Sequence, residues 1–139
     1  CLAEETALEP HARETLSLLH KKVPLYGASN GILAIQQARL EKANLTAYFS
    51  GLFVSDKIGA EKPDPRFFTF CLQRSGFPAE DVLMVGDSLT ADIAGAFSVG
   101  MDGCWYHPHT ARPPANTILP HAITDLRQLL SDPFVWGSP

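Results

Sequence analysis

The sequence predicts an α/β fold, specifically a doubly wound parallel sheet. Short apolar runs, rich in aliphatic and β-branched residues, alternate with longer stretches in which apolar residues recur at helical spacing. Apolar runs bounded by turn residues are typical of parallel strands that are buried on both faces. Strands and helices alternate along nearly the whole chain, which is the pattern of a parallel sheet covered by helices.

The first half of the chain contains two predicted strands. A helix opens at Pro10, and Ala12, Leu16 and Leu19 share one of its faces. The apolar run over residues 23–28 follows as a strand, because it is short and ends in small polar residues. After it, the chain is expected to form a helix to about residue 43 and then a second strand over 52–55.

The second half begins with an aromatic helix whose two ends are marked. Asp64 and Pro65 form a normal helix start, with proline at the first helical position, and Gly76 is placed to end the helix. The later elements are, in order, a strand over 81–85, a helix over 89–97 closed by a glycine at 100, a strand over 101–106, a short edge strand over 121–123 and a helix over 126–130.

Composition limits the classes of function. The chain has 139 residues, which suits one domain with its own core. Its 45% hydrophobic and 19% charged residues are ordinary for a globular protein. A formal net charge of −4 argues against general nucleic-acid binding, which needs a basic face. No apolar run is long enough to span a bilayer, and no signal peptide is visible, so no membrane partner is expected.

The three cysteines have unrelated spacings and do not suggest a disulfide framework. Cys71 lies on the apolar face of a predicted helix, and Cys104 lies in a predicted strand. Both are interpreted as buried thiols of a reducing compartment, so a cytoplasmic location is expected. The alternative for Cys1, a lipidated first residue, is not favoured because no lipobox is present.

The most informative segment is residues 82–93, where an apolar strand ends at Gly86-Asp87 and Asp92 follows in the next helix. Asp87 then lies at the carboxyl end of a parallel strand, where open α/β sheets place their ligands. Two carboxylates at such an edge suit a hard divalent cation such as Mg²⁺. On its own the segment also permits a purely structural interpretation, with Asp87 in a turn and Asp92 favoured by the helix dipole.

Two further segments follow strand ends of the same predicted sheet. Ser29-Asn30-Gly31 offers a hydroxyl and backbone N–H groups at a helix start, which together can bind an anion, although Ser29 and Asn30 alone could be N-cap residues. Lys62 precedes Pro63, which stiffens the chain and directs the ammonium group. A single loop lysine is usually solvated, so its interpretation depends on the other two segments.

Three segments resemble, in order, the second, third and fourth motifs of the haloacid dehalogenase (HAD) superfamily. They are Ser29-Asn30-Gly31, Lys62-Pro63-Asp64-Pro65 and the segment 86–92. The likeness extends over nearly the whole chain, from about Leu8 to Leu130. Gln36-Gln37 after the first of these segments and Cys104-Trp105 after the last further resemble the non-canonical pyrimidine 5′-nucleotidases, which cleave nucleoside monophosphates.

The resemblance implies a Rossmann-like core that hydrolyses phosphomonoesters with Mg²⁺ through an aspartyl-phosphate intermediate. By motif match, Ser29 would hydrogen-bond a phosphoryl oxygen within a phosphate site made of Ser29, Asn30, Gly31 and Lys62. Lys62 would also neutralise charge on the nucleophile and on the transferred group. Asp87 would be a Mg²⁺ ligand, and Asp92 would be a ligand or would hold a metal-bound water.

The family's first motif, Asp-x-Asp-x-Thr, occurs nowhere in the 139 residues. The resemblance therefore implies an incomplete HAD core with its first strand missing: a remnant of the helical cap at 1–9, the core at 10–132 and a tail at 133–139. In the family the nucleophile strand lies between the strands that here end at Ser29 and Gly86. Its loss should leave a gap, so the chain is expected to repair its sheet, to self-associate or to fold poorly, and to be inactive alone.

Three classes of function follow from these expectations. The first is a phosphomonoesterase of the superfamily acting on a small phosphorylated substrate, expected to be a nucleotide. The second is a 2-haloacid dehalogenase, which needs no metal; the pair Asp87 and Asp92 favours the metal-using branch. The third is a non-catalytic protein that keeps the phosphate site without the nucleophile.

Overall fold

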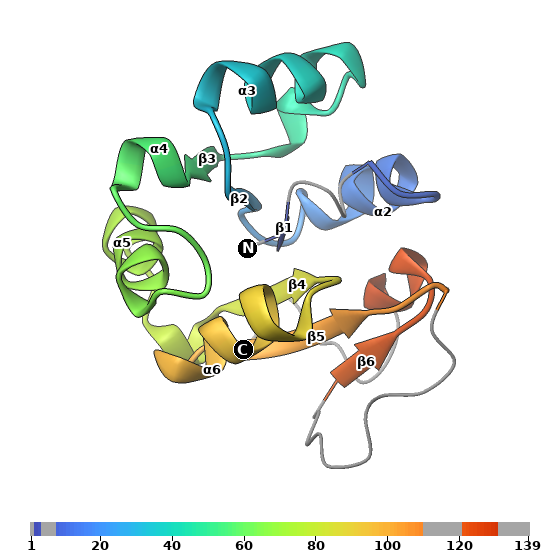
Figure 1. Ribbon diagram of the computed structural model, residues 1–139. Helices are drawn as coiled ribbons and strands as arrows, with labels where there is room; N and C mark the ends of the chain where they lie inside the picture. The colour runs from blue at the N-terminus through green and yellow to red at the C-terminus, as the bar shows by residue number, and fades with distance from the viewer. Residues whose placement is uncertain (1, 4–7, 110–120, 131–139) are drawn as a thin grey trace.

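A computed structural model of the chain describes residues 2–3, 8–109 and 121–130. Its centre is a six-stranded, entirely parallel sheet in the order β3-β2-β1-β4-β5-β6 (Figure 1). The strands are β1 (Leu2–Ala3), β2 (Tyr26–Ser29), β3 (Gly51–Val54), β4 (Leu83–Gly86), β5 (Asp102–Tyr106) and β6 (His121–Ile123). The parallel sheet predicted from the sequence is confirmed.

Several strand boundaries differ from the prediction by one to three residues, and two of the differences have clear local reasons. Strand β2 begins at Tyr26 because Pro24 has no N–H for a ladder and the N–H of Val23 still donates to Leu19 O, at 3.0 Å. Strand β3 ends at Val54, because Ser55 already begins a short helix, α4 (Ser55–Ile58), that the sequence did not predict. Helix α4 matters for the site described below.

The middle of the sheet is occupied by β1. Leu2 pairs with Gly27 of β2 and with Val85 of β4, and Ala3 pairs with Ala28. These two residues belong to the segment that was interpreted as a remnant of the cap, and they lie at the position where a gap was expected. Of the three expected consequences of that gap, the structure therefore shows repair of the sheet, by a strand of only two residues.

Helices cover both faces of the sheet. Helices α2 (Ala12–Leu19) and α3 (Leu33–Lys42), with the 3₁₀ helix η4 (Leu126–Leu130), pack against Val85 on one face. Helices α5 (Pro65–Ser75) and α6 (Gly95–Ser98) pack against Met84 on the other. The neighbours Met84 and Val85 belong to different cores because successive strand residues point to opposite faces. Among the described residues, no helix is long and apolar enough to cross a membrane.

The helix signals in the sequence are confirmed for α5 and modified after β4. Asp64 accepts a hydrogen bond from the N–H of Arg66 (2.9 Å), and Gly76 closes α5 at φ 79°. The helix predicted from Leu89 starts instead as a π-helical segment, η3 (Leu89–Ala94), and only then continues as α6. In it, the N–H of Ile93 reaches Ser88 O, five residues back, at 3.2 Å.

Both described cysteines are buried free thiols, as predicted. Burial raises the pKa of Cys71 and that of Cys104 from 9.0 to about 12. Since only the thiolate is nucleophilic, this shift lowers the reactive fraction near pH 8 by about 10³-fold. We expect iodoacetamide at pH 8 to leave both residues unmodified in the folded chain and to alkylate both rapidly in urea, as measured by peptide mass spectrometry. Equal rates in the two conditions would contradict the burial.

Candidate active site

The three segments singled out in the sequence meet at one edge of the sheet. Ser29 is the last residue of β2, and Asp87 directly follows Gly86, the last residue of β4. These two strands flank β1, so their carboxyl ends open onto the same place. Lys62 reaches this edge from the loop between α4 and α5. Ser29 is fully buried and Asp87 is exposed, so the site runs from the sheet interior to the surface.

A buried ion pair forms the floor of the site. Lys62 Nζ lies 2.6 Å from Asp92 Oδ1 and donates a second hydrogen bond to Ala28 O at 3.2 Å. Lys62 is 7% exposed and Asp92 is 2% exposed. Burial raises the pKa of Asp92 above its ordinary 3.8, while the charge and hydrogen bond of Lys62 lower it. The charged form of Asp92 therefore depends on Lys62.

Asp92 is fixed from its other side by the turn after β4. Its Oδ2 accepts a hydrogen bond from the N–H of Ser88 at 3.2 Å, and Ser88 Oγ in turn accepts from the N–H of Ala91 at 3.0 Å. A Cβ on Gly86 would overlap the Asp92 carboxylate. Glycine at the strand end thus lets the carboxylate lie directly against the backbone.

Asn30 holds the backbone of Lys62. Its Oδ1 accepts from the N–H of Lys62 at 2.7 Å, and its Nδ2 donates to Lys62 O at 3.0 Å. The peptide bond between Lys62 and Pro63 is cis. Asn30, matched to the phosphate site by resemblance, therefore uses its side chain to position the lysine.

The backbone donors after β2 are held by α4, which the sequence did not reveal. The N–H of Gly31 donates to Ser55 Oγ at 2.9 Å, and the N–H of Leu33 donates to Asp56 Oδ1 at 3.2 Å. Helix α3 begins at Leu33, later than the predicted start near Asn30. Ser55 and Asp56 thus stabilise the loop that carries Asn30 and Gly31. The sequence did not reveal this role, because these contacts join residues that are far apart along the chain.

Trp105 supports the Asp87 loop. Its indole N–H donates to Asp87 O at 3.0 Å, and its ring stacks on His107 with centroids 4.3 Å apart. Trp105 pairs with Gly86 in the sheet and is 5% exposed. Trp105 thus makes a direct hydrogen bond to the loop that carries the candidate metal ligand.

The carboxylates fit a divalent cation that is completed by other oxygen ligands. Within the described residues no group of three or more His, Cys, Asp or Glu side chains could hold a metal. Mg²⁺ commonly uses one or two carboxylates together with waters and a substrate phosphate. Asp87 is exposed, and its negative charge adds, less than burial does, to the raised pKa of Asp92, so the two carboxylates are near neighbours.

Comparison with known proteins assigns the chain to a family. A sequence model of the haloacid dehalogenase-like hydrolases matches residues 1–100. The chain belongs to this family of hydrolases.

Two relatives are pyrimidine 5′-nucleotidases. PynA of Streptococcus pneumoniae is 46% identical over 94 residues, covering 67% of this chain and 40% of PynA. YjjG of Escherichia coli is 34% identical over 133 residues, covering 93% of this chain and 59% of YjjG. The chain thus spans about half the length of the relatives it matches.

Solved structures agree on the fold. The magnesium-bound putative HAD-hydrolase YfnB of Bacillus subtilis superposes with a TM-score of 0.83 at 35% identity, covering 91% of this chain and 57% of YfnB. A 2-haloacid dehalogenase of Pseudomonas syringae gives a TM-score of 0.77 at 32% identity, covering 87% of this chain and 50% of that protein. The same fold is therefore found in a magnesium-bound HAD hydrolase and in a 2-haloacid dehalogenase.

Proposed function

We propose that this chain is part of a Mg²⁺-dependent phosphomonoesterase that acts on nucleoside monophosphates in the cytoplasm, with the attacking aspartate outside these 139 residues. The observation that carries the proposal is the buried pair of Lys62 and Asp92 beside the exposed Asp87. Two relatives named as pyrimidine 5′-nucleotidases support the nucleotide, and two buried thiols fit a reducing compartment. In this proposal residues 10–132, together with the central strand β1, belong to the core of the catalytic domain.

The lysine is placed to bind a phosphoryl oxygen. An ammonium group has three donors, and the described residues use two of those of Lys62, for Ala28 O and Asp92 Oδ1. The third donor can point to the substrate. Because Asn30 fixes the Lys62 backbone and Asp92 fixes the ammonium, the positive charge is preorganised, and such groups stabilise developing charge without reorganising.

Asp87 would hold Mg²⁺ at the mouth of the site, and Asp92 would hold a metal-bound water through an oxygen that also accepts from Ser88. When bound, the cation would neutralise phosphate charge and orient the phosphoryl group. Ser29 would donate its hydroxyl to a phosphoryl oxygen from the end of β2. Trp105 would keep the Asp87 loop in place during these steps.

The likeness to a 2-haloacid dehalogenase supports a second candidate, hydrolysis of a halogenated acid without metal. The carboxylate pair favours the metal-dependent phosphatase, because the exposed Asp87 with the buried Asp92 beside it suits a divalent cation. A non-catalytic phosphate-binding protein is the third candidate. It would bind phosphate without turnover even when the missing motif is supplied.

The test compares the chain alone with a version extended upstream by a segment carrying Asp-x-Asp-x-Thr. We expect release of phosphate from thymidine monophosphate and p-nitrophenyl phosphate only by the extended protein, and only with Mg²⁺. Halide release from 2-chloropropionate without Mg²⁺ would favour the dehalogenase instead. Turnover by the chain alone would show that another residue attacks phosphorus and would overturn the proposal.

A further inference from the structure

Two segments of the chain remain joined beyond the carboxyl ends of β2 and β3. Ser29 pairs with Val54 in the sheet, and hydrogen bonds continue past this last pair. The N–H of Gly31 donates to Ser55 Oγ at 2.9 Å, and the N–H of Asp56 donates to Gly31 O at 3.3 Å. The start of α4 is therefore fixed against the loop that follows Ser29.

Asp56 also supplies the cap that α3 lacks in its own sequence. Helix α3 begins at Leu33, and the residue before it, Ile32, has no polar side-chain atom that could accept from the first N–H groups of the helix. The N–H of Leu33 donates instead to Asp56 Oδ1, at 3.2 Å. A carboxylate at this place also suits the positive end of the helix dipole. Asp56 thus caps a helix whose first residue lies 23 positions earlier in the chain.

The far end of the segment 55–62 is fixed to the same loop by Asn30. Its Oδ1 accepts from the N–H of Lys62 at 2.7 Å, and its Nδ2 donates to Lys62 O at 3.0 Å. Segment 55–62 is thus joined to loop 30–33 at both of its ends, and we name this set of hydrogen bonds the clasp. Between the two ends, a Cβ added to Gly59 would meet no described atom within 4 Å. The clasp, rather than packing at Gly59, therefore fixes the course of the chain toward Lys62.

We propose that Asp56 and Ser55 are positioning residues of the hydrolase site, which act through the clasp to hold the backbone of Lys62. Lys62 is 7% exposed, and the position of its ammonium, which donates to Ala28 O and Asp92 Oδ1, depends on where its own backbone is held. A charge that stabilises a transition state is effective when it is in position before the reaction. The catalytic consequence rests on the proposed function, whereas the effect on Lys62 itself does not.

The first test measures the reactivity of Lys62 in the 139-residue chain. Trace acetylation by acetic anhydride, quantified for each lysine by peptide mass spectrometry, reports how often an ammonium loses its partners and meets solvent. We expect Lys62 to react about fivefold faster in Asp56→Ala, relative to the exposed Lys21, because the clasp loses its hydrogen bond to a charged acceptor. Asp56→Asn keeps an oxygen for the N–H of Leu33 and should restore most of the protection.

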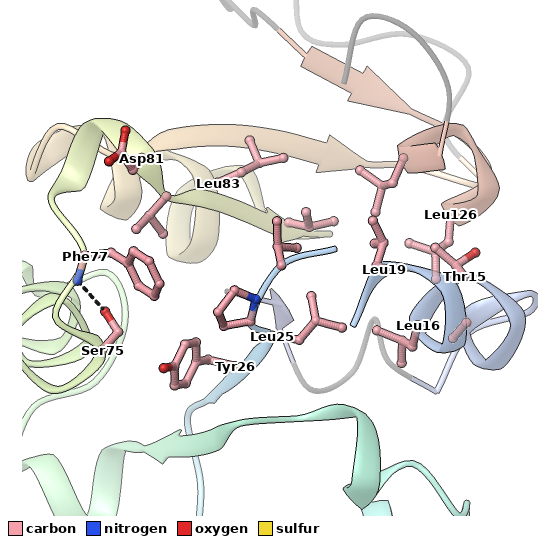
Figure 2. A pocket seen from close by; sticks show the side chains of 16 residues that line it. Thr15, Leu16, Leu19, Leu25, Tyr26, Ser75, Phe77, Asp81, Leu83 and Leu126 are labelled. Carbon is pink, nitrogen blue, oxygen red and sulfur yellow. Dashed lines mark hydrogen bonds between the residues drawn. The ribbon is translucent and has the colours of Figure 1, made fainter. Parts of the chain in front are cut away.

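Two control variants separate positioning from a general loss of stability. Figure 2 shows Leu19 in the wall of a pocket with Leu25, which directly precedes β2, and Leu83, the first residue of β4. The clasp follows the other end of β2. Leu19→Val shortens a buried side chain, so it should lower the Tm and yet leave the relative reactivity of Lys62 unchanged well below that Tm. Lys57→Ala, at an exposed position of α4, should also behave as the parent chain.

The second test asks whether Asp56 acts through the lysine. In the protein extended upstream by Asp-x-Asp-x-Thr, Asp56→Ala should lower kcat/KM for thymidine monophosphate by about tenfold and leave the Mg²⁺ requirement unchanged. In the Lys62→Ala background, the same substitution should have little further effect, because residues that act as a unit are not additive. Asp56→Asn should again recover most of the loss.

Two results would overturn the proposal. Equal reactivity of Lys62 in the parent and in Asp56→Ala would mean that the partners of the ammonium hold it alone and that Asp56 only caps α3. Full additivity with Lys62→Ala would mean that Asp56 acts independently of the lysine. Failure of the extended parent to turn over would contradict the proposed function alone, and the reactivity of Lys62 would still decide the positioning role.

A second variant covers the case in which Asp56→Ala does not fold, which rapid alkylation of the buried Cys71 would reveal. Ser55→Ala removes the acceptor of the Gly31 N–H and leaves the cap of α3 in place. It should raise the relative reactivity of Lys62 by about twofold or more, since one neutral hydrogen bond of the clasp is lost. Ser55→Thr keeps the hydroxyl and should match the parent chain.

Discussion

In the protein extended upstream by Asp-x-Asp-x-Thr, Lys62→Ala should lower kcat/KM for thymidine monophosphate by about 10²- to 10³-fold, the usual effect of removing one preorganised charge-stabilising donor. Lys62 is buried; its backbone makes two hydrogen bonds with the Asn30 side chain, and its ammonium donates to Ala28 O and to Asp92 Oδ1. Its positive charge is therefore already in position when charge develops on the phosphoryl oxygens. Steady-state kinetics at saturating Mg²⁺ measure the effect.

Asp87→Ala in the same extended protein should cause a similar or larger loss, but for a different reason. Asp87 is the exposed carboxylate at the mouth of the site, and its loop is fixed by the indole of Trp105. Its removal should raise the Mg²⁺ concentration needed for half-maximal activity, whereas Lys62→Ala should leave that concentration nearly unchanged. A Mg²⁺ titration of each variant therefore separates metal binding from charge stabilisation.

Surface variants provide the controls for this pair. Lys57→Ala and Asp81→Asn change exposed residues of the same types outside the site, so both should retain parental kcat/KM. If Asp87→Ala keeps full activity with an unchanged Mg²⁺ requirement, Asp87 is a turn residue and the proposed metal site is wrong. If Lys62→Ala keeps full activity, the buried pair is purely structural.

The strand ends of the site were predictable because they depend on local chemistry. Gly86 and Asp87 follow an apolar run, and Ser29 ends another, so the edge of a parallel sheet brings them together whatever the details of packing. The resemblance between motifs assigned Lys62 and Asp92 to one site but did not predict that they form an ion pair. Its 2.6 Å contact and its burial emerge only in the folded chain.

The unpredicted features depend on residues distant in sequence. Helix α4 has only four residues, too few for a periodic apolar pattern, yet Ser55 and Asp56 satisfy donors more than twenty residues away. The hydrogen bond from Trp105 to Asp87 requires β4 and β5 to pair in one particular register. Strand β1 forms because two neighbouring strands present their edges to it, and two residues carry no strand pattern of their own.

The largest effect on stability should come from Lys62→Met in the 139-residue chain without metal, with EDTA present. The substitution leaves the Asp92 carboxylate buried without its cation, a loss that typically costs about 3–5 kcal/mol of unfolding free energy. Urea denaturation at pH 8 measures it. Lys57→Met, at an exposed position, should change stability by no more than about 0.5 kcal/mol.

The cost of Lys62→Met should be smaller in acid. The folded-state pKa of Asp92 already lies above the ordinary 3.8, and loss of Lys62 removes two causes that lower it. Between the unfolded and the folded pKa the folded chain binds more protons than the unfolded chain, so the stability of the variant should fall as pH rises from about 4 through the folded pKa. Urea midpoints at pH 5 and pH 8 should therefore differ more for Lys62→Met than for the parent chain.

Neutralising the partner tests whether this cost comes from the unpaired charge. The double variant Lys62→Met with Asp92→Asn keeps the shape of the aspartate and an oxygen for the N–H of Ser88, but buries no charge. It should recover a large part of the stability lost in Lys62→Met and should lose most of the extra pH dependence. If instead the two substitutions add, the residues are not coupled, and the pair does not hold the floor of the site.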